Sequence, residues 1–145
     1  MVAKDGFILI CTANTGGKGD SQGVYTGTEI LNTAFLDRFG IKMKLEYLPQ
    51  EEERRMLASR FPAENAKEIE TMVRLATEIR SAFERGILAV TLSTRRLIEY
   101  FELKTVLGDG EAMRLCLLNW VDKDDEQLVR DVVSRATGRS PRSKS

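Results

Sequence analysis

Histidine is absent from this sequence of 145 residues. Its absence excludes catalytic triads with an imidazole base, zinc sites built on histidine and histidine acid–base catalysis. Cysteine is scarce: Cys11 and Cys116 lie far apart, and we expect both to be small core residues in a reducing compartment. No apolar run approaches the roughly 18 residues that cross a bilayer. The start of the chain has no hydrophobic signal region, so we expect a cytoplasmic protein.

An excess of charge of one sign is also absent. The 22 Lys and Arg residues balance 22 Asp and Glu residues, which gives a formal net charge of zero. This balance argues against a protein that coats nucleic acid or an anionic membrane surface. With 42% hydrophobic and 30% charged residues, the chain has the composition of a globular protein of one domain, or of two small ones.

Two segments near the start of the chain have strand patterns. Residues 7–13 are continuously apolar or small, which predicts a central strand buried on both faces of a parallel sheet. Residues 41–47 alternate between apolar and charged side chains, which predicts a half-buried strand near a sheet edge. A central strand needs neighbours on both sides, and too few residues precede Phe7 to supply them. We therefore expect the fold to begin in another polypeptide segment.

The remainder of the chain has helical patterns with identifiable starts and stops. A boundary near residues 48–49 separates an α/β part, residues 1–48, from a helical part, residues 49–137, and a basic tail of residues 138–145 that we expect to be disordered. We expect the acidic residues of 51–53 and 122–125 to be solvated side chains at helix starts. We expect Phe83, Phe101 and Trp120 to be core residues. The expected helices are 29–39, stopped by Gly40; one opening at Pro49; 64–85, stopped by Gly86; one capped by Ser93 and ending near 107; 111–121; and one capped by Asp122 and ending near 136.

The glycine-rich segment 15–28 resembles a phosphate-binding loop only superficially. Gly16, Gly17 and Lys18 follow a predicted strand, but Gly19 stands where Ser or Thr is required and the first glycine of the pattern is missing. The sequence also lacks a hydrophobic strand ending in paired acids that would hold magnesium. We interpret Lys18 as a loop lysine without a direct phosphate role.

Asn14 and Arg38 each have an ordinary and a functional interpretation. Asn14 ends the first predicted strand, where Asn is common at a turn, but where a neutral amide could also orient a water or a phosphate oxygen. The pattern leaves these two open. Arg38 could act in a neighbouring subunit's phosphate site, but its position in the last turn of a helix favours a simple solvated cation.

Arg95 and Arg96 carry the stronger local argument. They occupy the second and third positions of the helix that Ser93 caps, where cations oppose the helix dipole. Two arginines beside the free amides of a helix start form an anion receptor. The alternative is a salt bridge to an acid of the preceding part; we favour the anion site.

The sequence resembles the C-terminal half of an AAA+ ATPase of the MoxR-like group, and within it the small ATPase subunit of cobaltochelatase. The resemblance covers about residues 5–105. It implies the last strands of an AAA+ P-loop core sheet followed by an all-α lid bundle. The residues that carry it are Ala13-Asn14-Thr15, Gly19-Asp20, Gly23-x-Tyr25-x-Gly27-Thr28, Leu36-Asp37-Arg38-Phe39, Tyr47-Leu48-Pro49 and Ser93-Thr94-Arg95.

The resemblance implies a role for each candidate residue. Asn14 would be the sensor 1 residue and Arg38 the arginine finger, which acts in a neighbouring subunit. Sensor 2 would be Arg95, although Thr94 stands where the family usually has proline, which leaves the choice between Arg95 and Arg96 open. ATP and magnesium would be bound by the complete ATPase. The partners implied are an oligomeric AAA+ ring, the missing N-terminal half and chelatase-type subunits.

The phosphate loop and the magnesium-binding acids do not occur in the sequence. We therefore expect a truncated or split ATPase whose chain alone does not hydrolyse ATP. In a complete ring, ATP turnover would drive remodelling or metal insertion into a corrin. The first alternative is a catalytically inactive interaction domain derived from such an ATPase. A weaker alternative is a helical module that associates with nucleic acid through the basic tail.

Overall fold

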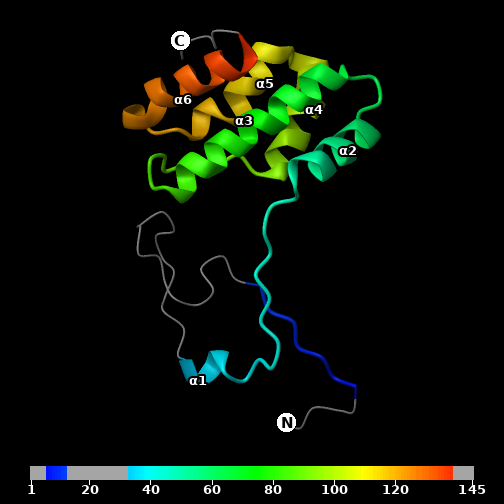
Figure 1. Cartoon of the computed structure of the whole chain (residues 1–145), viewed down its shortest axis with the longest axis vertical. Helices are drawn as coiled ribbons and strands as arrows, with labels where there is room; N and C mark the ends of the chain where they lie inside the picture. Colours follow the sequence, from blue (N-terminus) through cyan, green and yellow to red (C-terminus); the bar gives the residue numbers. More distant parts are fainter. Residues whose placement is uncertain (1–5, 13–32, 139–145) are drawn as a thin grey trace. The chain divides into compact units, whose positions relative to one another are not determined.

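The computed structural model describes residues 6–12 and 33–138, and the chain divides into two compact units (Figure 1). The first unit comprises Met1–Lys44 and the second comprises Leu45–Ser145. Asn14, Lys18 and the glycine-rich segment 15–28 lie outside the described residues. Each unit is described by itself below.

The first unit contains one short described helix, α1 (Thr33–Leu36). A turn follows it, in which the Arg38 N–H donates to Phe35 O and the Phe39 N–H donates to Leu36 O, both at 3.2 Å. The rings of Phe35 and Phe39 meet edge to face with centroids 5.4 Å apart. The helix expected up to Phe39 therefore ends earlier, and its expected first residues, 29–32, lie outside the described part.

The two segments with strand patterns form no strand in the part of the chain that the structure describes. The side chains of residues 7–10 are between 59% and 82% exposed, and those of Ile41, Met43 and Leu45 are more than 80% exposed. Cys11 is exposed as well. The expected burial of these residues is wrong here, because a strand is stable only when a neighbouring strand pairs with its backbone.

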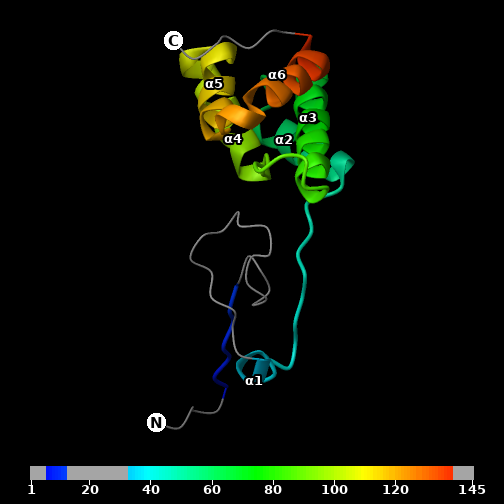
Figure 2. The ribbon, with the colours of Figure 1, turned by 90° about the vertical axis from the view of Figure 1, so that its left-hand side faces the viewer.

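The second unit is an all-α bundle, as the sequence predicts. Contacts are most extensive between α4 and α5, and α3 packs against α6, α2 and α4 (Figures 1 and 2). A single 3₁₀ turn, η1, joins α5 to α6. The helices are α2 (Gln50–Arg60), α3 (Ala66–Glu84), α4 (Thr94–Leu107), α5 (Asp109–Cys116) and α6 (Lys123–Thr137), and η1 is Leu118–Trp120.

Most helix ends lie where the sequence places them. The Asn65 side chain accepts the Lys67 N–H at 2.8 Å and starts α3, and Ser93 Oγ accepts the Arg96 N–H at 3.4 Å and starts α4. Gly86 ends α3 in the left-handed region, with φ of 68°. Because glycine lacks a Cβ, it adopts this conformation without strain.

Some boundaries differ from expectation. Pro49 precedes α2 as its N-cap rather than forming its first residue, and α3 begins at Ala66 rather than at residue 64. Asp122 occupies the N-cap of α6, as expected, but makes no capping side-chain hydrogen bond. The helix expected at 111–121 begins at Asp109, directly after Gly108 with its φ of 80°, and ends at Cys116. The chain then turns through η1, so the expected single helix is two shorter elements.

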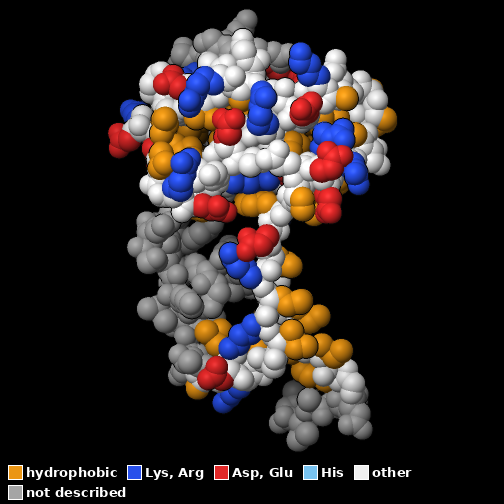
Figure 3. Space-filling model, in the orientation of Figure 1, with side chains coloured by type: hydrophobic (Ala, Val, Ile, Leu, Met, Phe, Trp, Pro, Cys, Tyr) orange, Lys and Arg blue, Asp and Glu red, His pale blue; other side chains and the backbone are white. Residues whose placement is uncertain are grey.

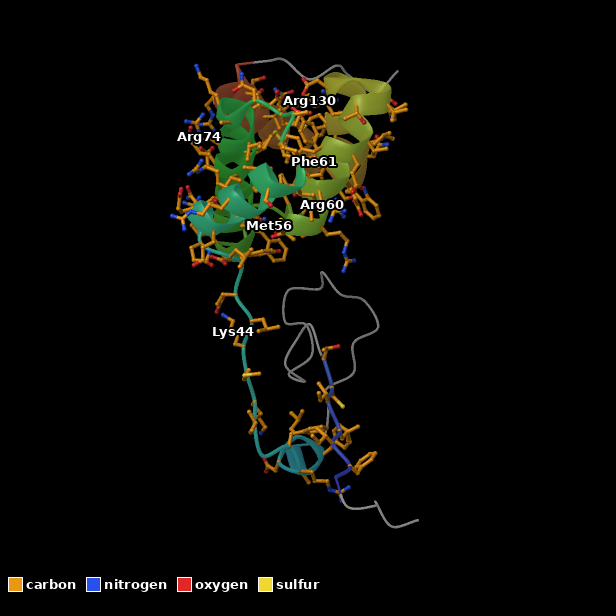
Figure 4. The ribbon with its side chains drawn as sticks, turned by 90° about the vertical axis from the view of Figure 1, so that its right-hand side faces the viewer. Lys44, Met56, Arg60, Phe61, Arg74 and Arg130 are labelled. Atoms are coloured by element: carbon orange, nitrogen blue, oxygen red, sulfur yellow. The ribbon has the colours of Figure 1, made fainter. Side chains whose placement is uncertain are left out.

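A single hydrophobic core fills the second unit. In α3, the apolar side chains of Ile69, Met72, Val73, Ala76 and Ile79 are buried, whereas Phe83, which we expected in the core, is only half-buried. Phe101 and Cys116 are buried as expected. Burial raises the pKa of the Cys116 thiol to about 11. Phe61, which directly follows α2, packs on Phe101 with ring centroids 5.3 Å apart, and Arg74 of α3 donates to the carbonyl oxygen of Ala136 in α6 at 3.0 Å (Figure 4).

Trp120 departs from the predicted core, because 61% of its surface is exposed. Its indole N–H donates to the Leu115 carbonyl oxygen at 3.1 Å, and its ring face is covered by Arg96. On the face of the helical bundle seen in Figure 3, cationic and anionic side chains are interspersed, and the extended segment leading to α2 carries charged side chains beside exposed hydrophobic ones. None of the described helices is long and apolar enough to cross a membrane.

Candidate anion-binding site at the start of helix α4

The first turn of α4 contains no acidic residue. Each of the other four α-helices of the second unit has at least one acid in its first turn. Acidic side chains are favourable there because they compensate the partial positive charge of the helix N-terminus. The start of α4 therefore combines an uncompensated helix dipole with the two arginines that follow Thr94.

Arg95 is exposed, and its side chain makes no hydrogen bond, ion pair or ring contact with any described residue. The guanidinium carries five N–H donors in a planar fork that fits phosphate and carboxylate oxygens. A cation left unpaired beside a helix N-terminus is available to an anionic ligand.

Arg96 is occupied by neighbouring groups. Its Nη1 donates to the Cys116 carbonyl oxygen at 3.3 Å, and its guanidinium carbon lies 4.2 Å from the centre of the Trp120 ring. This stacking attracts the cation to the electron-rich ring face. The two arginines lie side by side in the sequence, yet only Arg95 has an unoccupied guanidinium.

A buried polar network contacts the residues at the start of α4. Arg80 of α3 and Glu53 of α2 form a bidentate ion pair with both N–O distances at 2.8 Å, and their side chains are only 7% and 1% exposed. The Thr94 hydroxyl donates to Glu53 Oε1 at 2.6 Å. Arg80 Nε donates to the Leu92 carbonyl oxygen at 2.7 Å.

Tyr47 completes this network from the segment that precedes α2. Its ring centre lies 4.0 Å from the guanidinium carbon of Arg80. The ring thus covers the guanidinium face, while the guanidinium edge binds Glu53 and a backbone carbonyl. We call Tyr47, Glu53, Arg80, Thr94 and the Leu92 carbonyl the Glu53 network.

The burial of Glu53 corrects the expectation that residues 51–53 are all solvated. Glu53 is completely buried because it shares a helix face with Leu57, which also faces the core, and because Arg80 neutralises it there. Glu51 is exposed, as expected, and hydrogen bonds from Arg54 lower its pKa to about 2. The sequence contains one signal of this buried pair: Arg80 lies four residues after Ala76, on the apolar face of α3.

The acids expected to be solvated at the start of α6 need one similar correction. Asp125 is half-buried, and its Oδ2 accepts the Ala89 N–H at 2.9 Å. This hydrogen bond ties the start of α6 to the connection between α3 and α4. Asp122 and Asp124 are exposed.

A second polar cluster joins α3, α4 and α5. The Tyr100 hydroxyl donates to Asp109 Oδ1 and lies 3.3 Å from Glu68 Oε1. Lys104 Nζ lies 2.6 Å from Glu64 Oε2 and 2.8 Å from Glu68 Oε2. Burial and the hydrogen bond to Asp109 raise the pKa of Tyr100 well above its usual 10.0. Burial alone would lower the pKa of Lys104, but its two glutamate partners raise it above 10.5.

Arg38 is exposed after α1 in the first unit. Neighbouring Asp37 pairs with Lys42 at 3.5 Å, so Arg38 is not held by that acid. Among the arginines that the structure describes, only Arg38 and Arg95 have side chains without a hydrogen bond, an ion pair or a ring contact. The two lie in different units, and Asn14 lies outside the described residues.

The donor groups at the start of α4 fit an anion and not a metal ion. Guanidinium and backbone N–H groups donate hydrogen bonds, whereas magnesium binds oxygen ligands. Within residues 6–12 and 33–138, no group of three or more Cys, Asp or Glu is arranged to hold a metal.

The chain is similar to known proteins over most of its length. Residues 53–137 match the family described as CbbQ/NirQ/NorQ C-terminal. The aerobic cobaltochelatase subunit CobS from Sinorhizobium sp is 38% identical over 137 residues, which cover 91% of this chain and 41% of that protein. No solved structure matches the chain. The chain belongs to the CbbQ/NirQ/NorQ C-terminal family of MoxR-like AAA+ ATPases.

Proposed function

We propose that the helical unit is the lid of a MoxR-like AAA+ ATPase and that Arg95 is its sensor 2 residue, which binds the phosphates of ATP. The observation that carries this proposal is the unpaired, exposed guanidinium of Arg95 at a helix start without acids. Arg96 is the weaker candidate because Trp120 and the Cys116 carbonyl already hold it. We therefore assign sensor 2 to Arg95 in this proposal, although Thr94 replaces the usual proline of the motif.

Arg38 is the proposed arginine finger, which acts on the nucleotide of a neighbouring subunit. Its exposure and its lack of a side-chain partner support this role. An arginine supplied in this way accelerates phosphoryl transfer by about 10³–10⁵-fold in the nucleotidases that use one. Asn14 is the proposed sensor 1 residue, on the strength of the family motif alone.

ATP and magnesium are the proposed cofactors of the assembled ATPase. This chain would supply cationic and N–H groups to the phosphates, whereas a phosphate loop and magnesium-binding acids would come from other segments. In a ring, nucleotide turnover would drive remodelling of a client or, as the name of the CobS relative suggests, metal insertion by a chelatase. The chain spans 41% of that relative, so these activities are proposed for the whole assembly.

The test is reconstitution of ATPase activity. The full chain is mixed with a polypeptide of the same family that carries the phosphate loop and the magnesium-binding acids, and phosphate release is measured. We expect Arg95→Ala to weaken nucleotide affinity and Arg38→Ala to abolish turnover while nucleotide still binds. Arg55→Ala is the matched control, because Arg55 is an exposed arginine of α2 that pairs with Glu51.

Full turnover in Arg38→Ala would refute the finger assignment, and unchanged affinity in Arg95→Ala would refute the sensor 2 assignment. Assembly into a ring without any ATP turnover would favour an inactive interaction domain instead. The exposed apolar side chains of residues 7–10 and 41–45 are the observation that supports such a binding role.

A further inference from the structure

We infer that the Glu53 network is a positioning relay, which links the segment entering the helical unit to the first turn of α4 and so sets the place of Arg95. This inference rests on the proposed function of Arg95. It assigns positioning roles to Tyr47, Glu53 and Thr94, which do not themselves contact the anion.

The first argument is that the network is continuous. The ring of Tyr47 lies on one face of the Arg80 guanidinium. All three guanidinium nitrogens of Arg80 are used, two on Glu53 and one on the Leu92 carbonyl oxygen. Hydrogen bonds from its three nitrogens and the ring on one face leave the guanidinium of Arg80 little freedom to reorient. We therefore expect a shift of Tyr47 to displace Arg80 and the groups bonded to it.

The second argument is the contact with α4. Thr94 is the first residue of α4, and its hydroxyl is bound to the carboxylate of Glu53 at 2.6 Å. The Leu92 carbonyl, two residues earlier, is bound by Arg80. The network therefore bonds to the residue before and the residue after the N-cap residue Ser93, and Arg95 is the next residue of the helix.

The third argument is electrostatic. The carboxylate that bonds to Thr94 at the start of α4 belongs to Glu53 of α2, since α4 has no acid in its own first turn. Because Arg80 neutralises this carboxylate, Glu53 can orient the helix start without cancelling the charge of Arg95. An acid within the first turn of α4 would instead lie beside Arg95 and compete with the ligand.

The fourth argument is that stability alone gives little reason to keep this pair. Replacing a buried ion pair with apolar residues of similar size is often neutral or stabilising. A bidentate pair that also fixes a hydroxyl and a backbone carbonyl does something that apolar residues cannot do. It defines the orientation of the chain where α4 begins.

Thr94→Val and Thr94→Ser form the first test, because valine keeps the shape of threonine and serine keeps its hydroxyl. The probe is inorganic tripolyphosphate, titrated into the full chain and followed by the fluorescence of Trp120, the single tryptophan, which stacks on Arg96. We expect Thr94→Val to weaken binding about tenfold, as for loss of a hydrogen bond to a charged group. Thr94→Ser should stay within about twofold of the wild type.

Amide hydrogen exchange is the second measurement, and it does not depend on a ligand. Thr94→Val should accelerate exchange in residues 94–100, while residues 123–137 of α6 serve as the internal control. Tyr47→Leu should have the same effect, because it removes the ring face from Arg80, and Tyr47→Phe should not. The double variant Glu53→Leu with Arg80→Met should loosen the start of α4 even if the fold remains stable.

The outcomes separate the relay from the proposed function. If the wild type does not bind tripolyphosphate, the anion site is wrong, and exchange alone then decides whether the relay exists. Equal exchange in Thr94→Val, Tyr47→Leu and the wild type would overturn the relay. Faster exchange with unchanged tripolyphosphate affinity would overturn the link to Arg95.

Discussion

At the scale of single residues, the buried carboxylate of Glu53 has a large expected effect on stability. Glu53→Gln removes the charge that compensates Arg80, whose side chain is only 7% exposed. Removing one member of a buried ion pair leaves an uncompensated charge and costs about 3–5 kcal/mol. We therefore expect the free energy of unfolding, measured in urea, to fall by about this amount.

The control for this prediction is the double variant Glu53→Leu with Arg80→Met, which removes both charges. Its free energy of unfolding should lie close to that of the wild type or above it. A loss in the double variant as large as in Glu53→Gln would mean that packing and hydrogen bonds, rather than the unpaired charge, account for the effect.

At the scale of elements, Gly86 ends α3 in a motif that requires positive φ. The Gly86 N–H donates to Phe83 O at 2.9 Å, and the Ile87 N–H donates to Ala82 O at 2.9 Å, which are the two bonds of a Schellman motif. A Cβ at Gly86 would meet no atom within 4 Å, so the cost of Gly86→Ala arises from its φ of 68° alone. We expect a loss of about 1–2 kcal/mol in thermal or urea unfolding.

Gly110 provides the matched control, because it is the second residue of α5, has no positive φ, and a Cβ there also meets no atom within 4 Å. Alanine is favoured over glycine within a helix by about 0.5–1 kcal/mol. Gly110→Ala should therefore stabilise the protein, with the opposite sign to Gly86→Ala. Equal signs for the two variants would contradict the assignment of strain to Gly86.

The cluster that joins α3, α4 and α5 predicts an alkaline limit to stability. The pKa values of Tyr100 and Lys104 are both raised in the folded state, so the folded protein holds protons that the unfolded chain loses first. Their contribution is complete below about pH 10 and is lost as the pH rises further. The free energy of unfolding should fall above pH 10, and Tyr100→Phe with Lys104→Met should flatten this dependence. An unchanged slope in this variant would contradict the prediction.

The helical elements were largely predictable because their signals are local. Ser93 and Gly86 each act on backbone groups within a few residues, so sequence spacing alone locates them. The pairing of Glu53 with Arg80 was not predictable in this way, since its members lie 27 residues apart. An acid in the first turn of α2 looks the same in sequence whether it faces solvent or the core.

At the scale of the whole molecule, the apolar side chains of the extended segment 41–47 predict self-association. Met43 is 81% exposed within a row of alternating apolar residues, and contiguous exposed apolar surface favours association. Met43→Lys should reduce the large species detected by light scattering. Val106→Lys is the control, because Val106 is 78% exposed on the helical unit but lies outside this row. Equal effects of the two lysines would contradict a specific role for the segment.

The whole fold was predictable in its helical half and not in its first part. The apolar pattern of residues 7–10 predicts burial, but burial requires neighbouring strands, and the described residues form none. The sequence indicated a candidate site at the pair of arginines after Ser93. It did not indicate that Arg96 has side-chain partners and Arg95 has none among the described residues. That difference depends on Trp120 and the Cys116 carbonyl, which reach Arg96 from distant positions in the chain.

The bidentate pair of Glu53 and Arg80 also has an evolutionary consequence. Each single substitution passes through a protein with a buried, uncompensated charge, whereas the double substitution does not. Such an intermediate would be selected against, so the two positions should change together or remain as they are. Across related sequences we therefore expect an acid at position 53 to coincide with a cation at position 80, and an apolar residue at one to coincide with an apolar residue at the other.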